Sequence, residues 1–250
     1  MAGRKAVLVG ISGVSSSGKT TLCRLLRDIF PRTFILHEDD FYKTDAEIPV
    51  KDGIADWDCL EAINTTAFEQ ALAYIKTTGR SPPDLFSKED KNSVGEVDVN
   101  RDLIQRFRGD ASSKHHDHGT PIALIDGFLL FSEDMKAIRD LFDVKLLLRT
   151  DYETAKARRE ARSGYVTLEG FWKDPPEYVD KVVWPNYVKD HAFLFHEGDV
   201  QGALKDDLLG KLEIDAMPQR AQGNMTACVE WAYTILNDKL TQITSLDGSG

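Results

Sequence analysis

Residues 13–20 read GVSSSGKT and follow directly on the apolar run AVLVGI at residues 6–11. This stretch fits the pattern G-x-x-x-x-G-K-[ST], in which a glycine-rich turn links a strand to a helix. Such a turn points several backbone N–H groups and the positive end of the helix dipole at one place, which suits a polyphosphate. A serine-rich turn could match by chance, but the full pattern in a strand-turn-helix setting favours nucleotide binding. We therefore expect the chain to bind ATP or GTP, with Lys19 reaching the β- and γ-phosphates and the Thr20 hydroxyl holding Mg²⁺.

Length and composition indicate one globular α/β domain. The chain has 250 residues, of which 42% are hydrophobic and 29% charged, enough to bury one sizeable core. Its formal net charge of −10 argues against a general nucleic-acid binder, because such proteins present a basic face to the phosphate backbone. A neutral or cationic small substrate fits this charge better, so no nucleic-acid partner is expected.

The cysteines and the absence of a long apolar run favour a cytoplasmic protein. Cys23, Cys59 and Cys228 are odd in number and lack metal-ligand spacing, which is typical of reduced thiols. No signal peptide is recognisable, and no apolar stretch approaches the roughly 20 residues that span a bilayer. We expect no membrane partner.

Apolar runs typical of strands alternate with helical patterns, which indicates a parallel sheet covered by helices on both faces. Strands are predicted at residues 6–11, 33–36, 122–125 and 144–148, and helices at 64–79, 204–212, 224–240 and from the phosphate loop to about residue 30. We expect a single domain over residues 1–240, with a flexible insertion at 80–120, a lid region at 152–176 and a disordered tail at 241–250.

The predicted insertion ends in a histidine-rich run, KHHDHG at residues 114–119. Three histidines and an aspartate in four positions could bind a metal ion. Nothing else in the sequence fixes a geometry around them, however, and a mobile solvated loop is the better interpretation. We assign this run no catalytic role.

Carboxylates follow two of the predicted strands. Asp126 comes directly after the strand at 122–125, where an acidic residue beside a phosphate loop commonly supports Mg²⁺. Asp39 and Asp40 lie at the end of the strand at 33–36, at the sheet edge where ligands of α/β proteins bind. Neighbours on a strand point to opposite sides, so only one of the two aspartates is expected to face the site.

An aromatic and acidic cluster, DWD at residues 56–58, stands on the loop that follows. Trp57 could merely close a hydrophobic core, but its flanking carboxylates favour an edge position at a pocket mouth. A carboxylate such as Asp58 can accept hydrogen bonds from two vicinal hydroxyls, which a ribose offers.

A helix rich in arginine is predicted after the strand at 144–148. Residues 150–153 read TDYE, the form of a capping box, and the helix carries Arg158, Arg159 and Arg162. Such a helix could be a solvated face. Because it follows a strand of a nucleotide-binding sheet, a mobile basic lid that neutralises charge on the transferred phosphoryl group is the better interpretation.

Six motifs together resemble the nicotinamide riboside kinases, in particular the fungal form with its longer central insertion. They are GVSSSGKT (13–20), HEDDFYK (37–43), DWDCLEA (56–62), IDGFLLF (125–131), ARREARSGY (157–165) and WPNY (184–187). The match runs in order from about residue 6 to about residue 200. Many kinases and hydrolases share the phosphate loop, whereas the later motifs are much narrower. The resemblance implies a three-layer P-loop kinase fold of the uridine kinase-like group, with a helical lid.

The resemblance also implies an activity: transfer of the γ-phosphate of ATP to the 5′-hydroxyl of nicotinamide riboside, giving nicotinamide mononucleotide for NAD⁺ salvage, with Mg²⁺ as cofactor. In that family the second aspartate of the DDF motif accepts the proton and contributes to the metal site, which falls here on Asp40. The aromatic and acidic pair of the next loop falls on Trp57 and Asp58, as a ring-stacking partner and a ribose ligand.

The lid residues follow by the same resemblance. Arg158 and Arg159 correspond to the paired arginines that contact nucleotide and substrate, Arg162 to a third lid arginine, and Tyr165 to the tyrosine that closes on the base. A flat pyridinium cation held between Trp57 and Tyr165 would be favoured by on the order of 1–2 kcal/mol.

The predicted site residues fall into four groups. Those expected to bind ATP are Gly13, Ser15, Ser16, Ser17, Gly18, Lys19, Thr20, Thr21, Arg158 and Arg162. Those expected to bind the riboside are Asp40, Tyr42, Trp57, Asp58, Arg159 and Tyr165. The metal is assigned to Thr20, Asp40 and Asp126, and catalysis to Asp40 and Lys19.

Two other functions stay open at this stage. A uridine-kinase-like nucleoside kinase would use the same fold with a neutral base in the pocket. A regulatory module that only senses or hydrolyses ATP belongs to a different class, but it would have no need of the acceptor-site residues Asp40, Trp57 and Asp58. A monomer or weak homodimer is expected, and the sequence does not decide between ATP and GTP.

Overall fold

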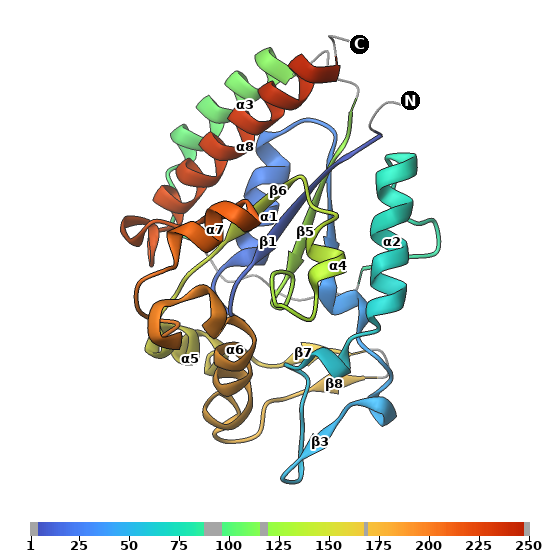
Figure 1. Ribbon diagram of the computed structural model, residues 1–250, viewed down its shortest axis with the longest axis vertical. Helices are drawn as coiled ribbons and strands as arrows, with labels where there is room; N and C mark the ends of the chain where they lie inside the picture. The colour runs from blue at the N-terminus through green and yellow to red at the C-terminus, as the bar shows by residue number, and fades with distance from the viewer. Residues whose placement is uncertain (1–4, 88–96, 116–119, 168–169, 248–250) are drawn as a thin grey trace.

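A five-stranded parallel sheet forms the centre of the computed structural model, which describes residues 5–87, 97–115, 120–167 and 170–247 (Figure 1). The strands stand in the order β2-β5-β1-β6-β9, and all neighbouring pairs are parallel. Their bounds are β1 Val7–Ser12, β2 Thr33–His37, β5 Ile122–Gly127, β6 Val144–Leu147 and β9 Ile214–Ala216. The predicted α/β fold and four predicted strands are confirmed, and β9 is an edge strand that was not predicted.

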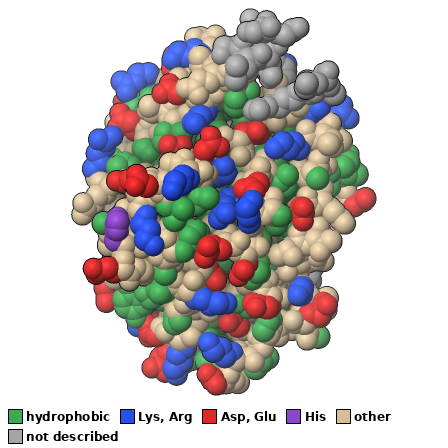
Figure 2. All heavy atoms as spheres, viewed as in Figure 1, with side chains coloured by type: hydrophobic (Ala, Val, Ile, Leu, Met, Phe, Trp, Pro, Cys, Tyr) green, Lys and Arg blue, Asp and Glu red, His purple; other side chains and the backbone are tan. Residues whose placement is uncertain are grey.

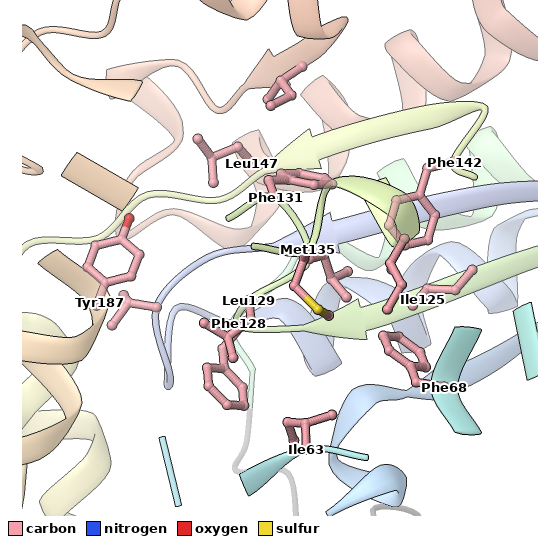
Figure 3. Packing of buried hydrophobic residues seen from close by; sticks show 14 of the residues in the cluster. Ile63, Phe68, Ile125, Phe128, Leu129, Phe131, Met135, Phe142, Leu147 and Tyr187 are labelled. Carbon is pink, nitrogen blue, oxygen red and sulfur yellow. The ribbon is translucent and has the colours of Figure 1, made fainter. Parts of the chain in front are cut away.

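Helices cover both faces of the sheet, because alternate strand residues point to opposite sides. In β1, Val7 and Val9 pack into a core shared with α1, α3 and α8, whereas Leu8 packs into a second core with α2 and α6. Figure 3 shows the second core, in which Phe68 of α2 lies near Ile125 of β5. The helices are α1 Lys19–Ile29, α2 Thr65–Thr78, α3 Arg101–His115, α4 Lys136–Arg139, α5 Tyr152–Glu160, α6 Trp184–His191, α7 Asp206–Leu212 and α8 Met225–Asp247.

Two short antiparallel hairpins lie together at one end of the molecule (Figure 1). They pair β3 (Val50–Lys51) with β4 (Ile54–Ala55), and β7 (Tyr165–Val166) with β8 (Phe171–Trp172). The described part of the segment 152–176, predicted as the lid region, contains α5 and the paired strands β7 and β8.

The predicted flexible insertion contains a packed helix. Of residues 80–120, Arg101–His115 form α3, which lies beside α8 (Figure 1). The Phe107 ring stacks on that of Tyr233 in α8, with centroids 4.0 Å apart, and the Tyr233 hydroxyl donates a hydrogen bond to Asp110. This part of the prediction was wrong, because one face of a polar helix is enough to dock it on the rest of the core.

The histidine-rich run is only partly within the described residues. Residues 88–96 and 116–119 lie outside them, so the suggested metal site at 114–119 has no structural description. His115 itself ends α3 and is hydrogen-bonded through Nε2 to the Asn237 side chain, 3.1 Å away.

The helix ends follow the signals predicted from the sequence, except at the start of α5 and the end of α8. The Asn64 side chain caps α2 by accepting from the Ala67 N–H, as predicted, and Gly79 ends that helix with φ 72°. Helix α5 is capped by Asp151 rather than by a box that begins at residue 150, since Asp151 accepts from the Thr154 N–H. Helix α8 continues to Asp247, into the segment predicted as a disordered tail.

The surface carries both signs of charge. Figure 2 shows Lys and Arg side chains interspersed with Asp and Glu over the visible face. None of the helices in the described ranges is long and apolar enough to cross a membrane.

A buried histidine at the end of α6 predicts a pH-dependent stability. His191 is wholly buried, and burial lowers its pKa to about 4, although its contact with the Tyr187 carbonyl acts in the opposite direction. The folded protein thus keeps this ring neutral while the unfolded chain takes up a proton near the usual pKa of 6.5. Stability from this group is complete above the unfolded pKa and is lost as the pH falls toward 4. We expect it to contribute about 2 kcal/mol to the decrease in unfolding free energy between pH 7 and pH 4.5.

Urea unfolding at several pH values would measure this contribution. In the His191→Leu variant the decrease should be smaller than in the wild type by that amount. The exposed His196 provides the matched control, and His196→Leu should leave the wild-type pH dependence intact. Identical pH dependence in His191→Leu and the wild type would contradict the assignment.

Candidate active site

The phosphate loop has the backbone that its glycines require. Gly13 has φ +148°, and a Cβ there would lie 2.6 Å from the Leu148 carbonyl oxygen. Gly18 has φ +101° and precedes the first residue of α1, Lys19. The Lys19 ammonium donates a hydrogen bond to the Val14 carbonyl across the turn, at 3.2 Å. Strand, turn and helix therefore follow as the sequence predicts.

A cavity of about 670 Å³ opens in front of this loop. It brings together most of the predicted site residues: Ser15, Ser16, Ser17, Gly18, Lys19, Thr20, Thr21, Tyr42, Trp57, Asp58, Asp126, Arg158, Arg159, Arg162 and Tyr165. Gly13 and Asp40 are the predicted residues that do not line it. Gly13 instead allows the phosphate loop to pass close to the Leu148 carbonyl.

Asp39, rather than Asp40, is the aspartate of the DDF motif that lines the cavity. The sequence analysis placed both at the end of a strand, but they lie in the short 3₁₀ helix η1, Glu38–Phe41. A 3₁₀ helix turns by about 120° per residue, so the alternation rule for strands does not identify which side chain faces the ligand. The roles predicted for Asp40 stay a prediction, and Asp39 becomes the second candidate for them because it lines the cavity.

Thr20 and Asp126 meet on the floor of the cavity. The Thr20 hydroxyl donates to Asp126 Oδ2 at 2.5 Å, and His37 Nδ1 lies 3.2 Å from the same oxygen. Burial alone would raise the pKa of Asp126, but the His37 hydrogen bond and the positive charge of Lys19 outweigh it and hold that pKa below its usual value. Asp126 is therefore a carboxylate in the folded protein at neutral pH.

Arg159 connects three segments around the cavity. Its guanidinium donates to both oxygens of Asp58, at 3.2 and 3.1 Å, and to the Ser15 hydroxyl at 2.6 Å. It also donates to both oxygens of Asp174, at 2.7 and 3.2 Å. Arg159 and Asp58 are only 7% and 4% exposed. The phosphate loop, the DWD loop and the lid region are thus joined through one buried side chain.

The other two lid arginines are less enclosed. Arg158 donates to the Ser16 carbonyl of the phosphate loop, at 3.4 Å. Arg162 donates to the Tyr165 hydroxyl, at 3.2 Å. Both guanidinium groups border the cavity.

Both rings of the predicted sandwich, Trp57 and Tyr165, line the cavity, and each has its own neighbours. Trp57 meets the Tyr42 ring edge-on, with centroids 5.3 Å apart, and the Trp172 ring at 5.8 Å. The Tyr165 ring instead lies under the Arg159 guanidinium, 4.5 Å from the centroid. Trp172 is therefore the lid residue whose ring contacts Trp57.

Several residues around the cavity were missed by sequence reasoning. Trp172 and Asp174 follow the arginine helix in the segment FWKD, and the indole N–H of Trp172 donates to Asp174 Oδ1 at 2.8 Å. An aromatic pair followed by an acid, close to a basic helix, is the signal that could have found them. Val97 and Asp98, which lead into α3, and Met225 at the start of α8 also line the cavity, and no motif marks them.

The comparisons with known proteins agree with the motifs. The chain is 50% identical over 237 residues to a nicotinamide riboside kinase of Schizosaccharomyces pombe, covering 94% of this chain and 98% of that protein. It is 39% identical over 209 residues to the nicotinamide riboside kinase of Saccharomyces cerevisiae, covering 82% and 85%. It is 30% identical over 245 residues to human nicotinamide riboside kinase 2, covering 89% and 93%.

No protein-family model matches the chain. The relatives instead show which family the chain belongs to. Three of them are at least 30% identical to this chain over more than four fifths of both chains. The protein belongs to the nicotinamide riboside kinase family.

Proposed function

We propose that the protein is an ATP-dependent kinase that phosphorylates the 5′-hydroxyl of nicotinamide riboside, giving nicotinamide mononucleotide for NAD⁺ salvage. The observation that carries this proposal is one cavity in which the phosphate loop faces Asp39, Asp58 and Trp57. A module that only bound or hydrolysed ATP would have no use for these three residues, which we propose bind the phosphoryl acceptor. The family relationship supports the choice of riboside.

The donor side of the cavity suits a nucleoside triphosphate. Backbone N–H groups of the phosphate loop and the start of α1 would hold the phosphates, with the Lys19 ammonium on the terminal ones. Arg158 and Arg162 border the same space and would neutralise charge on the transferred phosphoryl group.

The residues beside the phosphate loop fit Mg²⁺ brought by ATP. Thr20 and Asp126 offer oxygen atoms within hydrogen-bond distance of each other, and Mg²⁺ usually binds through one or two such groups, phosphates and water. Thr20 would hold the ion directly, and Asp126 directly or through water. When bound, Mg²⁺ would neutralise charge on the β- and γ-phosphates. Within the described residues no cluster of three or more His, Cys, Asp or Glu side chains forms a separate metal site.

The acceptor side suits a ribose that carries a flat cation. Asp58 and Arg159 offer a carboxylate and a guanidinium to the ribose hydroxyls. Trp57, Trp172 and Tyr42 present aromatic faces that attract a pyridinium ring. Tyr165, held by the lid arginines, would close over the bound base.

Asp39 is the proposed proton acceptor. It lines the cavity next to the phosphate loop, where it would take the proton of the 5′-hydroxyl as the phosphoryl group is transferred. Phosphoryl transfer needs little further covalent chemistry, so positioning and charge neutralisation by the loop and the arginines would supply most of the acceleration.

We also propose a cytoplasmic monomer or weak homodimer whose small-molecule substrates are ATP and nicotinamide riboside. The three cysteines are free and buried, which suits a reducing compartment. Light scattering coupled to gel filtration would establish the oligomeric state.

Removing the Trp57 ring should weaken riboside binding more than turnover. We expect Trp57→Ala to raise the KM for nicotinamide riboside about tenfold, because a desolvated cation–π contact is lost, and to leave the KM for ATP nearly unchanged. Trp57→Phe keeps an aromatic face and should restore most of the affinity. An unchanged riboside KM in the alanine variant would remove the stacking role.

A coupled assay with Mg-ATP and a panel of acceptors tests the proposed function. Nicotinamide riboside, adenosine, uridine and no acceptor are compared, and the product is identified by mass. Riboside-dependent ADP release with nicotinamide mononucleotide as product is expected. Turnover with uridine alone would indicate a uridine-kinase-like enzyme, and release without any acceptor would place the protein outside the kinases.

A further inference from the structure

Glu38 is a buried carboxylate enclosed between two residues of the cavity wall. Its neighbours in sequence, His37 and Asp39, both line the cavity, whereas Glu38 is wholly buried. It occupies the first position of the 3₁₀ helix η1 and points away from the ligand space into the protein. None of the roles proposed above uses it.

The Glu38 carboxylate binds the backbone that follows β5. Its Oε2 atom accepts hydrogen bonds from the N–H groups of Phe128, at 2.7 Å, and Leu129, at 3.2 Å. These amides come immediately after Asp126 and Gly127. The contact is close-packed, because a Cβ on Gly127 would lie 2.6 Å from the same Oε2 atom.

The position of this contact in the sheet is informative. Strands β2 and β5 are paired in parallel register, and the last pair is His37 with Asp126. Beyond that pair the two chains separate, one into η1 with Asp39 and the other into the loop at Phe128. The hydrogen bonds from the Phe128 and Leu129 amides to the Glu38 carboxylate therefore join the two segments just beyond the last backbone pair of β2 and β5.

Asp39 and Asp126 are the two carboxylates that the proposed reaction needs at fixed positions. One accepts the proton of the acceptor, and the other supports the metal beside the phosphates. A misplacement of about 1 Å in such groups can lower a rate about 100-fold. A contact that fixes the two chain ends relative to each other thus has a direct catalytic consequence.

We propose that Glu38 is a positioning residue that sets the separation of Asp39 and Asp126 by bonding the Phe128 and Leu129 amides. This inference rests on the proposed kinase function but does not depend on which nucleoside is the acceptor. A role in packing alone would be served better by an apolar side chain, because a buried carboxylate is costly. Burial raises the pKa of Glu38 to about 7, against the effect of the two N–H donors.

Two substitutions separate length from charge. Glu38→Gln keeps the length and an oxygen that can accept both amide hydrogen bonds, but it loses the charge. Glu38→Asp keeps the charge but is one methylene too short to reach both amides. A positioning role predicts that Gln retains kcat within about threefold of wild type, whereas Asp loses about tenfold or more, with the KM values for both substrates little changed.

Hydrogen–deuterium exchange gives a second readout that needs no acceptor. In Glu38→Asp the amides of Phe128 and Leu129 should exchange faster than in wild type, and in Glu38→Gln they should stay protected. Glu47→Asp is the matched control, since the Glu47 carboxylate is hydrogen-bonded to Thr44 and, among the described residues, does not line the cavity. It should change neither readout.

The outcomes are distinct. Equal kcat in Glu38→Asp and wild type, or a larger loss in Glu38→Gln than in Glu38→Asp, would overturn the positioning role. So would unchanged exchange at Phe128 and Leu129 in Glu38→Asp. Rates are measured with whichever nucleoside the wild type phosphorylates fastest, so failure of nicotinamide riboside as substrate would refute the proposed function and leave the Glu38 comparison decisive.

Discussion

The Asp39→Asn variant should lose about 100-fold or more in kcat for riboside phosphorylation, while its affinity for ATP stays close to that of the wild type. The amide has nearly the shape of the carboxylate but cannot accept the proton of the 5′-hydroxyl. Because Asp39 lies in η1 and outside the phosphate loop, nucleotide binding should survive. Steady-state kinetics together with titration of a fluorescent ATP analogue would measure both effects.

Asp40→Asn is the matched control for this prediction. The two aspartates are adjacent and chemically identical, but Asp40 is not part of the cavity lining. We expect its kcat to stay within about fivefold of the wild-type value. If Asp40→Asn instead lost most of its turnover and Asp39→Asn retained it, the assignment of the proton acceptor from the family motif would stand and the one from the cavity would fail.

The central fold could be predicted because the inner strands are mostly apolar and fully buried. Strands β1 and β5 are buried at every residue, so their sequences read as continuous hydrophobic runs between polar segments. Strand β9 consists of three residues, IDA, at the sheet edge, and only Ile214 is buried. A strand of three residues with an aspartate at its centre gives no periodic signal.

The insertion shows the limit of composition as a guide. Helix α3 is strongly polar, and its buried residues include only Ile104 and Ala111 among the apolar ones. What holds it is a tertiary contact, the stacking of Phe107 on Tyr233, which comes from a helix more than one hundred residues later in the chain. Sequence patterns report local periodicity and do not report such partners.

For the candidate site, the motifs predict which residue types take part, whereas the fold decides which side chains line the cavity. The phosphate loop and the arginine helix have fixed local geometry, and most of the residues predicted on them line the cavity. Asp39 and Asp40 lie in a 3₁₀ turn, so the strand rule did not apply to them. Trp172 belongs to the β7–β8 hairpin, and its contact with Trp57, which lies far away in the sequence, is a property of the tertiary structure.

Arg159 interacts with several residues of the site at the same time. It meets Asp58, Asp174 and Ser15 at once, and the Tyr165 ring covers it. A planar guanidinium has five N–H donors in a fixed arrangement, which a lysine ammonium cannot reproduce. The same side chain therefore holds the acceptor loop, the lid region and the phosphate loop in their relative positions.

Replacing Arg159 should affect both activity and stability. We expect Arg159→Lys to lower kcat/KM for the riboside about 100-fold, because one ammonium cannot hold Asp58 and Asp174 together.

Arg159→Ala should reduce the unfolding free energy by about 3 kcal/mol, since it leaves a buried carboxylate without its partner. Kinetics and urea unfolding measure the two effects. Lys156 on the same helix pairs with the partly exposed Asp180, at 2.7 Å, and Lys156→Met should lower the stability much less than Arg159→Ala does. Equal losses of unfolding free energy in the Arg159 and Lys156 variants would contradict a special contribution from the buried Arg159 cluster. Full activity in Arg159→Lys would mean that the five N–H donors of the guanidinium do not position the acceptor.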